Sequence, residues 1–200
     1  IYPYRPHLKH MVFLVQQAKL LGHQINFLEI NNGFENIFPK LEENFIKRTI
    51  ASLKIKYAGL NGFLNESPDY INNYIKKTGY EIDSSKFMYS AQSTVAGKFG
   101  ICDEKDLHSK KIQKSIKKNL IDIKTAYKAS IEWLEIEHFD MVIGFNGRVD
   151  ITNSIMQACI DRDVPYFSLE RSWTGEGIQL IGNGTPLSLS SIHSLVEPWN

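Results

Sequence analysis

Residues 140–171 read DMVIGFNGRVDITNSIMQACIDRDVPYFSLER. The residue types predict a strand at 141–145, a tight turn at 146–148, a helix to about residue 161 and a second strand at 165–169. Each strand is an apolar run that is followed by polar residues. In a parallel α/β sheet the carboxyl ends of neighbouring strands lie side by side, and ligands bind in the crevice outside them. We therefore expect the polar residues after both strands to line one crevice.

The first polar group is Asn146-Gly147-Arg148. A glycine directly after a strand permits a positive φ and a close approach of the backbone to a ligand. Arg148 offers a planar fork of donors that suits phosphate or carboxylate. The N-terminus of the following helix attracts anions, and we expect Asp150 or Thr152 to cap it. The same residues also suit a plain tight turn with a surface arginine.

The second polar group is Glu170-Arg171. In a crevice, Glu170 would orient a sugar hydroxyl or act as a general base, and Arg171 would bind a phosphate or an acidic sugar. Trp173 follows closely and could stack on a sugar ring. The alternative is a structural ion pair, for which Arg148 is a possible partner of Glu170.

The N-terminal part predicts the opening unit of a doubly wound fold. A strand-like opening segment comes before a helix that runs from Pro6 to Gly22, and a strand at 24–30 follows. Arg5 and His7 lie in the expected loop before this helix. We expect that loop to face the same crevice, because it follows the carboxyl end of a strand.

A helical insertion is predicted from about residue 60 to residue 138, between the two β–α units. A helix from Pro39 to Gly59 comes before it. Within the insertion the expected helices cover 67–79, 83–96 (ended by Gly97 and Gly100) and 103–138, the last broken at most once.

The longest of these helices combines an apolar stripe with many lysines. The stripe steps by three or four residues and consists of Ile112, Ile116, Leu120, Ile123, Tyr127, Ile131 and Leu134. The lysines around it are Lys105, Lys110, Lys111, Lys114, Lys117, Lys118, Lys124 and Lys128. They suit a solvated face, or a basic surface for an acidic glycan, a membrane surface or a protein partner. Aromatic residues do not interleave with them, which argues against a platform for single-stranded nucleic acid.

The composition is that of an ordinary globular chain: 200 residues, 42% hydrophobic and 22% charged. We expect one Rossmann-like domain over 1–200, with a parallel sheet and helices on both faces. A net charge of +1 gives no general attraction to nucleic acid. Cys102 and Cys159 are far apart, which favours a reducing, cytoplasmic setting, and Cys159 suits a buried thiol. Because Ile1 is not a start methionine, we expect a portion of a longer chain.

No metal or hydrolase motif is present. The six histidines lack H-x-x-x-H and H-E-x-x-H spacing, so we expect no metal site. Ser188 and His193 lie close together in sequence, but there is no G-x-S-x-G elbow and no acid partner can be assigned to them. No Walker A or G-x-G-x-x-G pattern occurs.

The motifs FNGR at 145–148 and PYFSLER at 165–171, followed by Leu-Ile-Gly-Asn and by Pro186 to His193, resemble those of bacterial surface and capsule polysaccharide biosynthesis proteins. That family is similar to GT-B glycosyltransferases, in which two Rossmann-like domains face each other across a cleft. Many members have Asn-Gly-Arg after one strand and Glu-Arg-Gly after the next. Here Ser172 stands in place of that glycine.

The resemblance implies that this chain is the acceptor-binding N-terminal half of such an enzyme. It implies a cleft core of Asn146, Arg148 and Glu170, with Glu170 as base or acceptor orienter. The residues implied at the edge of the cleft are Arg171, His193, Arg5 and His7. A nucleotide sugar would be the substrate, bound mainly by a C-terminal half. No cofactor or metal is implied, and the location would be cytoplasmic, at most peripheral to the inner membrane.

Two other classes of function fit the same residues. One is a non-catalytic module that binds a nucleotide or glycan in the crevice, or docks a partner through the lysine-rich helix. The other is a sugar-nucleotide epimerase of the GT-B type, which would need nucleotide binding and no acceptor. The sequence alone leaves open the donor, the acceptor, the linkage and whether the chain is an enzyme by itself.

Overall fold

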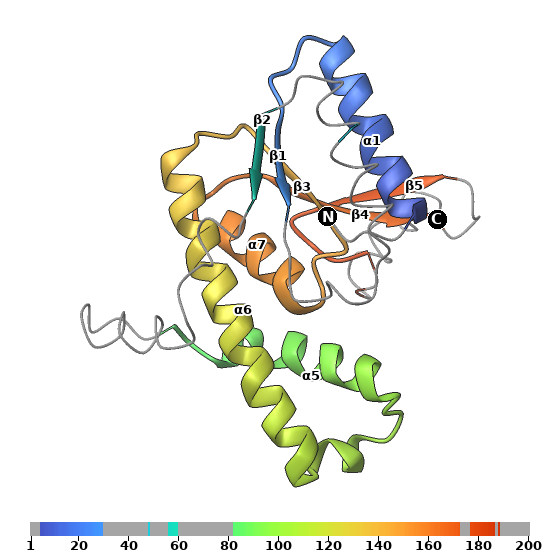
Figure 1. The fold of residues 1–200 in the computed structure, drawn as a ribbon, viewed down its shortest axis with the longest axis vertical. Helices are drawn as coiled ribbons and strands as arrows, with labels where there is room; N and C mark the ends of the chain where they lie inside the picture. The colour runs from blue at the N-terminus through green and yellow to red at the C-terminus, as the bar shows by residue number, and fades with distance from the viewer. Residues whose placement is uncertain are drawn as a thin grey trace, which may run out of the picture. The chain divides into compact units, whose positions relative to one another are not determined.

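The computed structural model describes residues 5–29, 48, 56–59, 82–172, 177–186 and 188, and for residues 5–9, 27–29, 56–59 and 150 it describes the backbone only. These residues form a mixed α/β fold (Figure 1). The chain divides into two compact units. Unit 1 comprises residues 1–65 and 170–179, and unit 2 comprises residues 66–169 and 180–200. No helix in the described part of the chain is long and apolar enough to cross a membrane.

Unit 1 contains a helix and a parallel strand pair. Helix α1 (Arg5–Leu20) is followed by a turn in which Gly22 has a φ of +86°. The prediction that Gly22 ends this helix is confirmed. Strand β1 (Asn26–Glu29) lies within the predicted strand and pairs in parallel with β2 (Lys56–Gly59).

Strand β2 corrects one prediction. Residues 56–59 were assigned to the end of a helix that began at Pro39, and Arg48 is indeed helical. Ile55 and Tyr57 alternate with Lys54 and Lys56, however, and this period of two is that of a strand. The spacing of Tyr57 from Leu53 suited a helix equally well. The pairing of residues 56–59 with β1 shows that they form a strand.

Two helices and a short 3₁₀ segment form a helical hairpin in unit 2. Helix α5 (Ser85–Phe99) ends at Gly100, which has a left-handed φ of 63°. The 3₁₀ helix η2 (Glu104–His108) leads into α6 (Lys110–Ile136), whose Ser109 side chain caps the N-terminus. The predicted long helix with one break is confirmed. The helix predicted to end at Gly97 continues through that residue to Phe99.

The apolar stripe of α6 is buried, as its spacing predicted. Ile112, Ile116, Leu120, Ile123, Tyr127 and Leu134 are all buried, and Ile131 is half-buried. Full burial of such side chains stabilises a fold by roughly 1.5–3 kcal/mol each. One lysine does not belong to a solvated face: Lys128 is buried and its Nζ lies 2.9 Å from Glu132 Oε1, one turn further along.

The rest of unit 2 is built around helix α7 (Asp150–Asp161). This helix follows β3 (Val142–Phe145) and contacts α5 and α6. Ala158 and Cys159 are fully buried, and the buried Ser154 hydroxyl donates to the Ile123 carbonyl of α6 at 2.8 Å. The predictions of this helix, of the strand before it and of a buried Cys159 are confirmed.

The three-stranded sheet has the order β3-β4-β5, with β4 at Tyr166–Arg171 and β5 at Ile178–Gly182. β3 and β4 are parallel, as predicted. β5 runs antiparallel to β4, because the N–H of Asn183 donates to the Tyr166 carbonyl and the N–H of Ser172 donates to the Gly177 carbonyl. The expectation of an all-parallel sheet is therefore wrong for this edge. At the level of fold class, the mixed α/β class is confirmed, and a Rossmann-like fold stays a prediction.

Several predicted features lie outside the described residues. They are the strand-like opening segment, the helix from Pro39 apart from Arg48 and residues 56–59, the helix at 67–79, Trp173 and the segment that contains His193.

Candidate functional site

The turn after β3 combines two consecutive residues with positive φ. Asn146 has a φ of 56° and Gly147 a φ of 72°, a conformation that glycine and asparagine adopt most easily. The Gly147 N–H donates to the Phe145 carbonyl at 2.6 Å, and the Arg148 N–H donates to Asn146 Oδ1 at 3.0 Å. The Asn146 N–H donates to the Leu169 carbonyl of β4 at 3.0 Å. The Asn146 side chain thus holds the turn, and its backbone continues the sheet.

Gly147 is required by close packing as well as by its φ. A Cβ at this position would lie 2.8 Å from Ser168 Oγ and 2.9 Å from Met156 Sδ. The predicted positive φ is therefore confirmed. The close contacts at Gly147 are made by side chains of the protein itself, and the approach of a ligand stays a prediction. In the strand before the turn, Gly144 leaves room for the buried Tyr166 ring.

Two polar atoms beside this turn are buried without a hydrogen-bond partner among the described residues. One is Arg148 Nε, a donor, and the other is Asn153 Oδ1, an acceptor. Asn153 is only 8% exposed, and its Nδ2 donates to the Gly147 carbonyl at 2.9 Å. Leaving such buried atoms unpaired costs about 1–3 kcal/mol each, so a group that pairs with them would be held firmly.

Asn153 was not among the predicted site residues. The signal that could have found it is the polar run Thr152-Asn153-Ser154 in the first turns of a helix whose following residues are mostly apolar. All three residues are buried, and buried polar side chains need partners.

The expected cap of α7 does not form. The N-cap residue is Val149, which provides no side-chain acceptor, and the Thr152 hydroxyl donates to the Val149 carbonyl. Asp150 is the first residue of the helix and not its cap.

Glu170 and Arg171 are the last two residues of β4, not residues that follow it. The Arg171 N–H donates to Glu170 Oε1 at 2.9 Å. Both residues belong to unit 1, whereas the Asn146 turn belongs to unit 2. A crevice or ion pair that joins Glu170 to Arg148 stays a prediction.

The remaining predicted site residues are at the two ends of the chain. Arg5 and His7 lie in the first turns of α1, not in a loop before it, because the helix begins at Arg5. Pro6, which suits the first turn of a helix, is one residue inside it. His193 lies outside the described residues.

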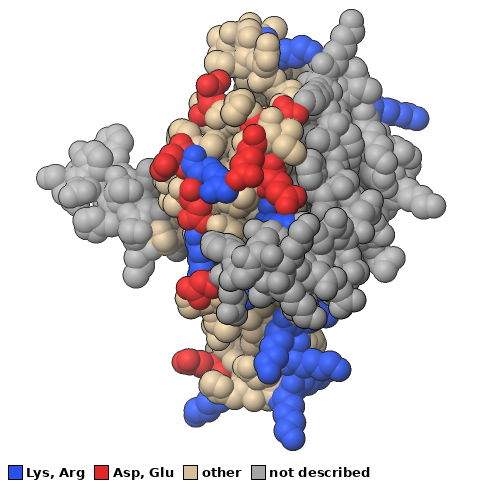
Figure 2. All heavy atoms as spheres, turned by 90° about the vertical axis from the view of Figure 1, so that its left-hand side faces the viewer, with Lys and Arg blue, Asp and Glu red and all other residues tan. Residues whose placement is uncertain are grey.

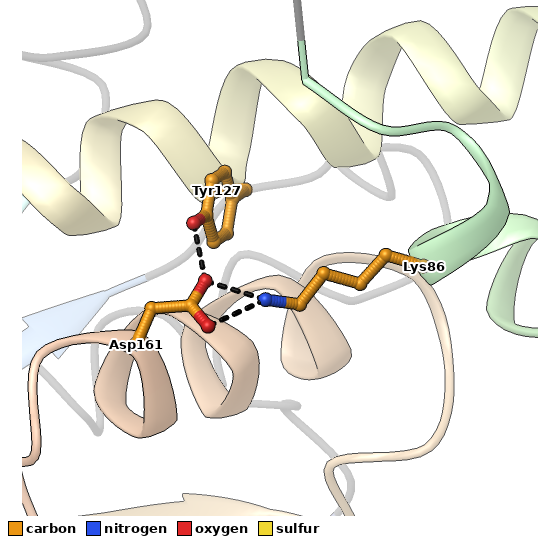
Figure 3. A network of polar contacts seen from close by, with 3 residues as sticks. All are labelled: Lys86, Tyr127 and Asp161. Carbon is orange, nitrogen blue, oxygen red and sulfur yellow. Dashed lines mark hydrogen bonds and ion pairs between the residues drawn. The ribbon is translucent and has the colours of Figure 1, made fainter.

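A polar cluster of Lys86, Tyr127 and Asp161 connects the three helices α5, α6 and α7 (Figure 3). Lys86 Nζ lies 2.6 Å and 2.5 Å from the two carboxylate oxygens of Asp161, and the Tyr127 hydroxyl donates to the same carboxylate. Lys86 Nζ also lies 5.4 Å from the centroid of the Tyr127 ring. Lys86 and Asp161 are 75 positions apart in the sequence. No local spacing of residues could therefore predict this cluster.

The pKa of Asp161 is set by opposing effects. Burial raises this pKa. The hydrogen bonds from Lys86 and Tyr127 and the charges of Lys86 and Arg162 lower it by a larger amount, so the pKa lies below its ordinary value of 3.8. The Asp161 carboxylate is therefore ionised at neutral pH, and it accepts the hydrogen bonds of Lys86 and Tyr127 in that form. We interpret the cluster as a structural clasp between helices.

Among the described residues, no group of three or more His, Cys, Asp or Glu side chains is placed to hold a metal ion. Comparison with family models, with curated proteins and with solved structures finds no match for this chain. The geometry of the Asn146 turn is therefore the main guide to function.

Proposed function

We propose that the Asn146 turn of unit 2 binds a hydroxyl group of a saccharide. The observation that carries this proposal is the pair of buried, unpartnered atoms beside Gly147, Arg148 Nε and Asn153 Oδ1. A hydroxyl group both accepts and donates hydrogen bonds, so sugar hydroxyls match the donor Arg148 Nε and the acceptor Asn153 Oδ1 in kind. A fully ionised phosphate only accepts, and it would leave Asn153 Oδ1 unpaired.

The wider proposal is that the chain is the acceptor-side domain of a glycosyltransferase-like protein of bacterial surface polysaccharide synthesis. Its support is the resemblance of the motifs at 145–148 and 165–171, together with a turn that follows the carboxyl end of a parallel strand. A Rossmann-like fold of the GT-B type belongs to this proposal. A nucleotide sugar would be the donor, held mainly by a second domain.

The same proposal gives roles to the other residues. Glu170 would orient the acceptor or take its proton, and Arg171 would bind an acidic group of the sugar. Arg5, His7 and His193 would lie at the edge of the acceptor site. A cytoplasmic location also belongs to the proposal and is supported by the unpaired Cys102 and Cys159.

The test is a thermal-shift panel on the chain and on three variants. Its ligands are nucleotides, nucleotide sugars, neutral oligosaccharides and acidic oligosaccharides. A ligand at a hundred times its dissociation constant adds roughly 2.7 kcal/mol to the free energy of unfolding, which is readily seen. We expect oligosaccharides to raise the melting temperature of the wild type and not that of Arg148→Ala.

The matched control is Arg162→Ala, which removes an arginine at the far end of α7 that pairs with Glu135. This variant should keep the oligosaccharide response. A third variant, Glu170→Ala, asks whether Glu170 contributes to the same site, and a lost response would support its assigned role. If nucleotides alone raise the melting temperature, or if Arg148→Ala keeps the full response, the proposed acceptor site is wrong.

A further inference from the structure

The lysines of the helical hairpin are strongly concentrated in one segment. Residues 98–118, which run from the end of α5 through η2 into α6, contain seven lysines and three acidic residues, a formal charge of +4. The whole chain carries only +1. Figure 2 shows Lys and Arg atoms gathered at the lower end of the view, where Figure 1 places the N-terminal half of α6, and mainly Asp and Glu atoms above them.

Five of these lysines form one face of α6, which we term the lysine face. It consists of Lys110, Lys111, Lys114, Lys117 and Lys118, and all five are exposed. At 100° per residue they fall within an arc of roughly 120°, on the side of the helix opposite to the buried stripe. No acidic residue occurs in α6 before Asp122.

This arrangement opposes the stability of the helix. The pairs Lys110–Lys114 and Lys114–Lys118 place like charges one turn apart, where they repel. The first turn of α6 contains no acidic residue, although negative charge is preferred there and positive charge is not. The repulsion between these lysines therefore does not help the helix to fold, which is expected of a surface that serves a binding partner.

An aromatic ring borders the lysine face. Phe99, the last residue of α5, is 39% exposed, and Lys111 Nζ lies 5.4 Å from the centroid of its ring. A cluster of lysines is attracted to the surface of an anionic bilayer, and an exposed aromatic side chain at its border suits the headgroup region.

The use of lysine in place of arginine favours a partner with a uniformly charged surface. Every cation between residues 82 and 147 apart from histidine is a lysine. Defined phosphate or carboxylate groups are better recognised by the bidentate fork of arginine, whereas lysine is sufficient for attraction to a uniformly charged surface. We propose that the lysine face and Phe99 bind the chain peripherally to a membrane that is rich in anionic lipid.

The test is sedimentation of the chain with vesicles of phosphatidylcholine, with and without phosphatidylglycerol. We expect binding only to the anionic vesicles, with loss of binding at high salt. The variant Lys110→Gln/Lys114→Gln/Lys117→Gln should bind on the order of 100-fold more weakly, because each lysine contributes about a fivefold gain near an anionic surface. Its melting temperature should be unchanged or higher, which separates lost binding from lost folding.

A control variant with the same change of net charge is Lys19→Gln/Arg48→Gln/Arg162→Gln, which alters exposed cations outside the hairpin. It should bind almost as the wild type does. The proposal is overturned if the wild type does not sediment with anionic vesicles, or if both triple variants lose binding equally. It is also overturned if an anionic polysaccharide or RNA binds through these lysines while vesicles do not. None of these outcomes depends on the proposed saccharide site.

Discussion

Gly147 is the residue whose replacement tests the packing of the turn. The variant Gly147→Ala would place a Cβ at a φ of 72° and within 3.0 Å of both Ser168 Oγ and Met156 Sδ. The backbone conformation costs roughly 1–2 kcal/mol and the overpacking about 1–3 kcal/mol. We expect a loss of about 2–5 kcal/mol in the free energy of unfolding, measured by urea denaturation.

The matched control is Gly97→Ala in the interior of α5. Nothing lies within 4 Å of a Cβ built at Gly97, and its φ is not positive. Alanine should therefore stabilise the helix by about 0.5–1 kcal/mol. Equal effects of the two substitutions would mean that the turn is not packed as described.

At the scale of single residues, the sequence predicted conformation better than contact. Asn-Gly after a strand implies positive φ, and both residues have it. The partners of Gly147 were not predictable, because Ser168 and Met156 reach it from β4 and α7 only once the fold has formed. Asn153 could have been found from the polar run at 152–154. The cap of α7 was assigned to the wrong residue because the first residue of a helix is hard to place from residue types alone.

At the scale of elements, the clasp of Lys86, Tyr127 and Asp161 should contribute to the stability of unit 2. The variant Asp161→Asn removes the charge that both partners bind while keeping the shape of the side chain. We expect a loss of about 1–2 kcal/mol at neutral pH, because charge-assisted hydrogen bonds between half-exposed groups are worth about that much. The more exposed Arg162–Glu135 pair provides the control, and Glu135→Gln should cost less than about 0.5 kcal/mol.

The pH dependence of the same variant gives an independent check. The pKa of Asp161 is lower in the folded chain than its ordinary value of 3.8. The stability that this shift contributes is therefore present above pH 3.8 and is lost as the pH falls through the folded pKa. The difference between wild type and Asp161→Asn should be constant near neutral pH and shrink in acid. A difference that does not shrink would show that the charge of Asp161 is not what holds the helices.

Helices with one apolar stripe were the most predictable elements. The spacing from Ile112 to Leu134 was sufficient to place α6 and its buried face. Strand β2 was mistaken for helix because four residues are too few to separate a period of two from a period of 3.6. The antiparallel β5 could have been foreseen: only six residues lie between Arg171 and Ile178, and a parallel crossover needs a dozen or more.

At the scale of the whole molecule, the sequence indicated the α/β class from the alternation of helices and strands. The division into two compact units was not foreseen, because unit 1 takes residues 170–179 from a distant part of the chain. The predicted single domain over 1–200, its place in a longer chain and the joint crevice stay predictions. They depend on long-range arrangement, which local periodicity does not determine.

Cys159 offers a measurement of how unit 2 as a whole holds together. Its side chain is fully buried in α7, and burial raises the pKa of the thiol to about 12. In a Cys102→Ser variant it is the only thiol of the chain. It can react only when unit 2 opens, so we expect labelling to be at least about 1,000-fold slower than that of the exposed Cys102 in a Cys159→Ser variant.

The same labelling assay connects the three scales, because Gly147 precedes α7 and Asp161 is its last residue. If α7 opens only together with unit 2, Gly147→Ala and Asp161→Asn should each speed the labelling of Cys159 by the factor that their loss of stability predicts, about tenfold for each 1.4 kcal/mol. Gly97→Ala should slow it slightly. Two outcomes would contradict this: Cys159 reacts as fast as Cys102 in the native chain, or all three substitutions leave its labelling rate unchanged. Either would mean that α7 opens locally, and that the packing of unit 2 does not hold the buried site beside Gly147.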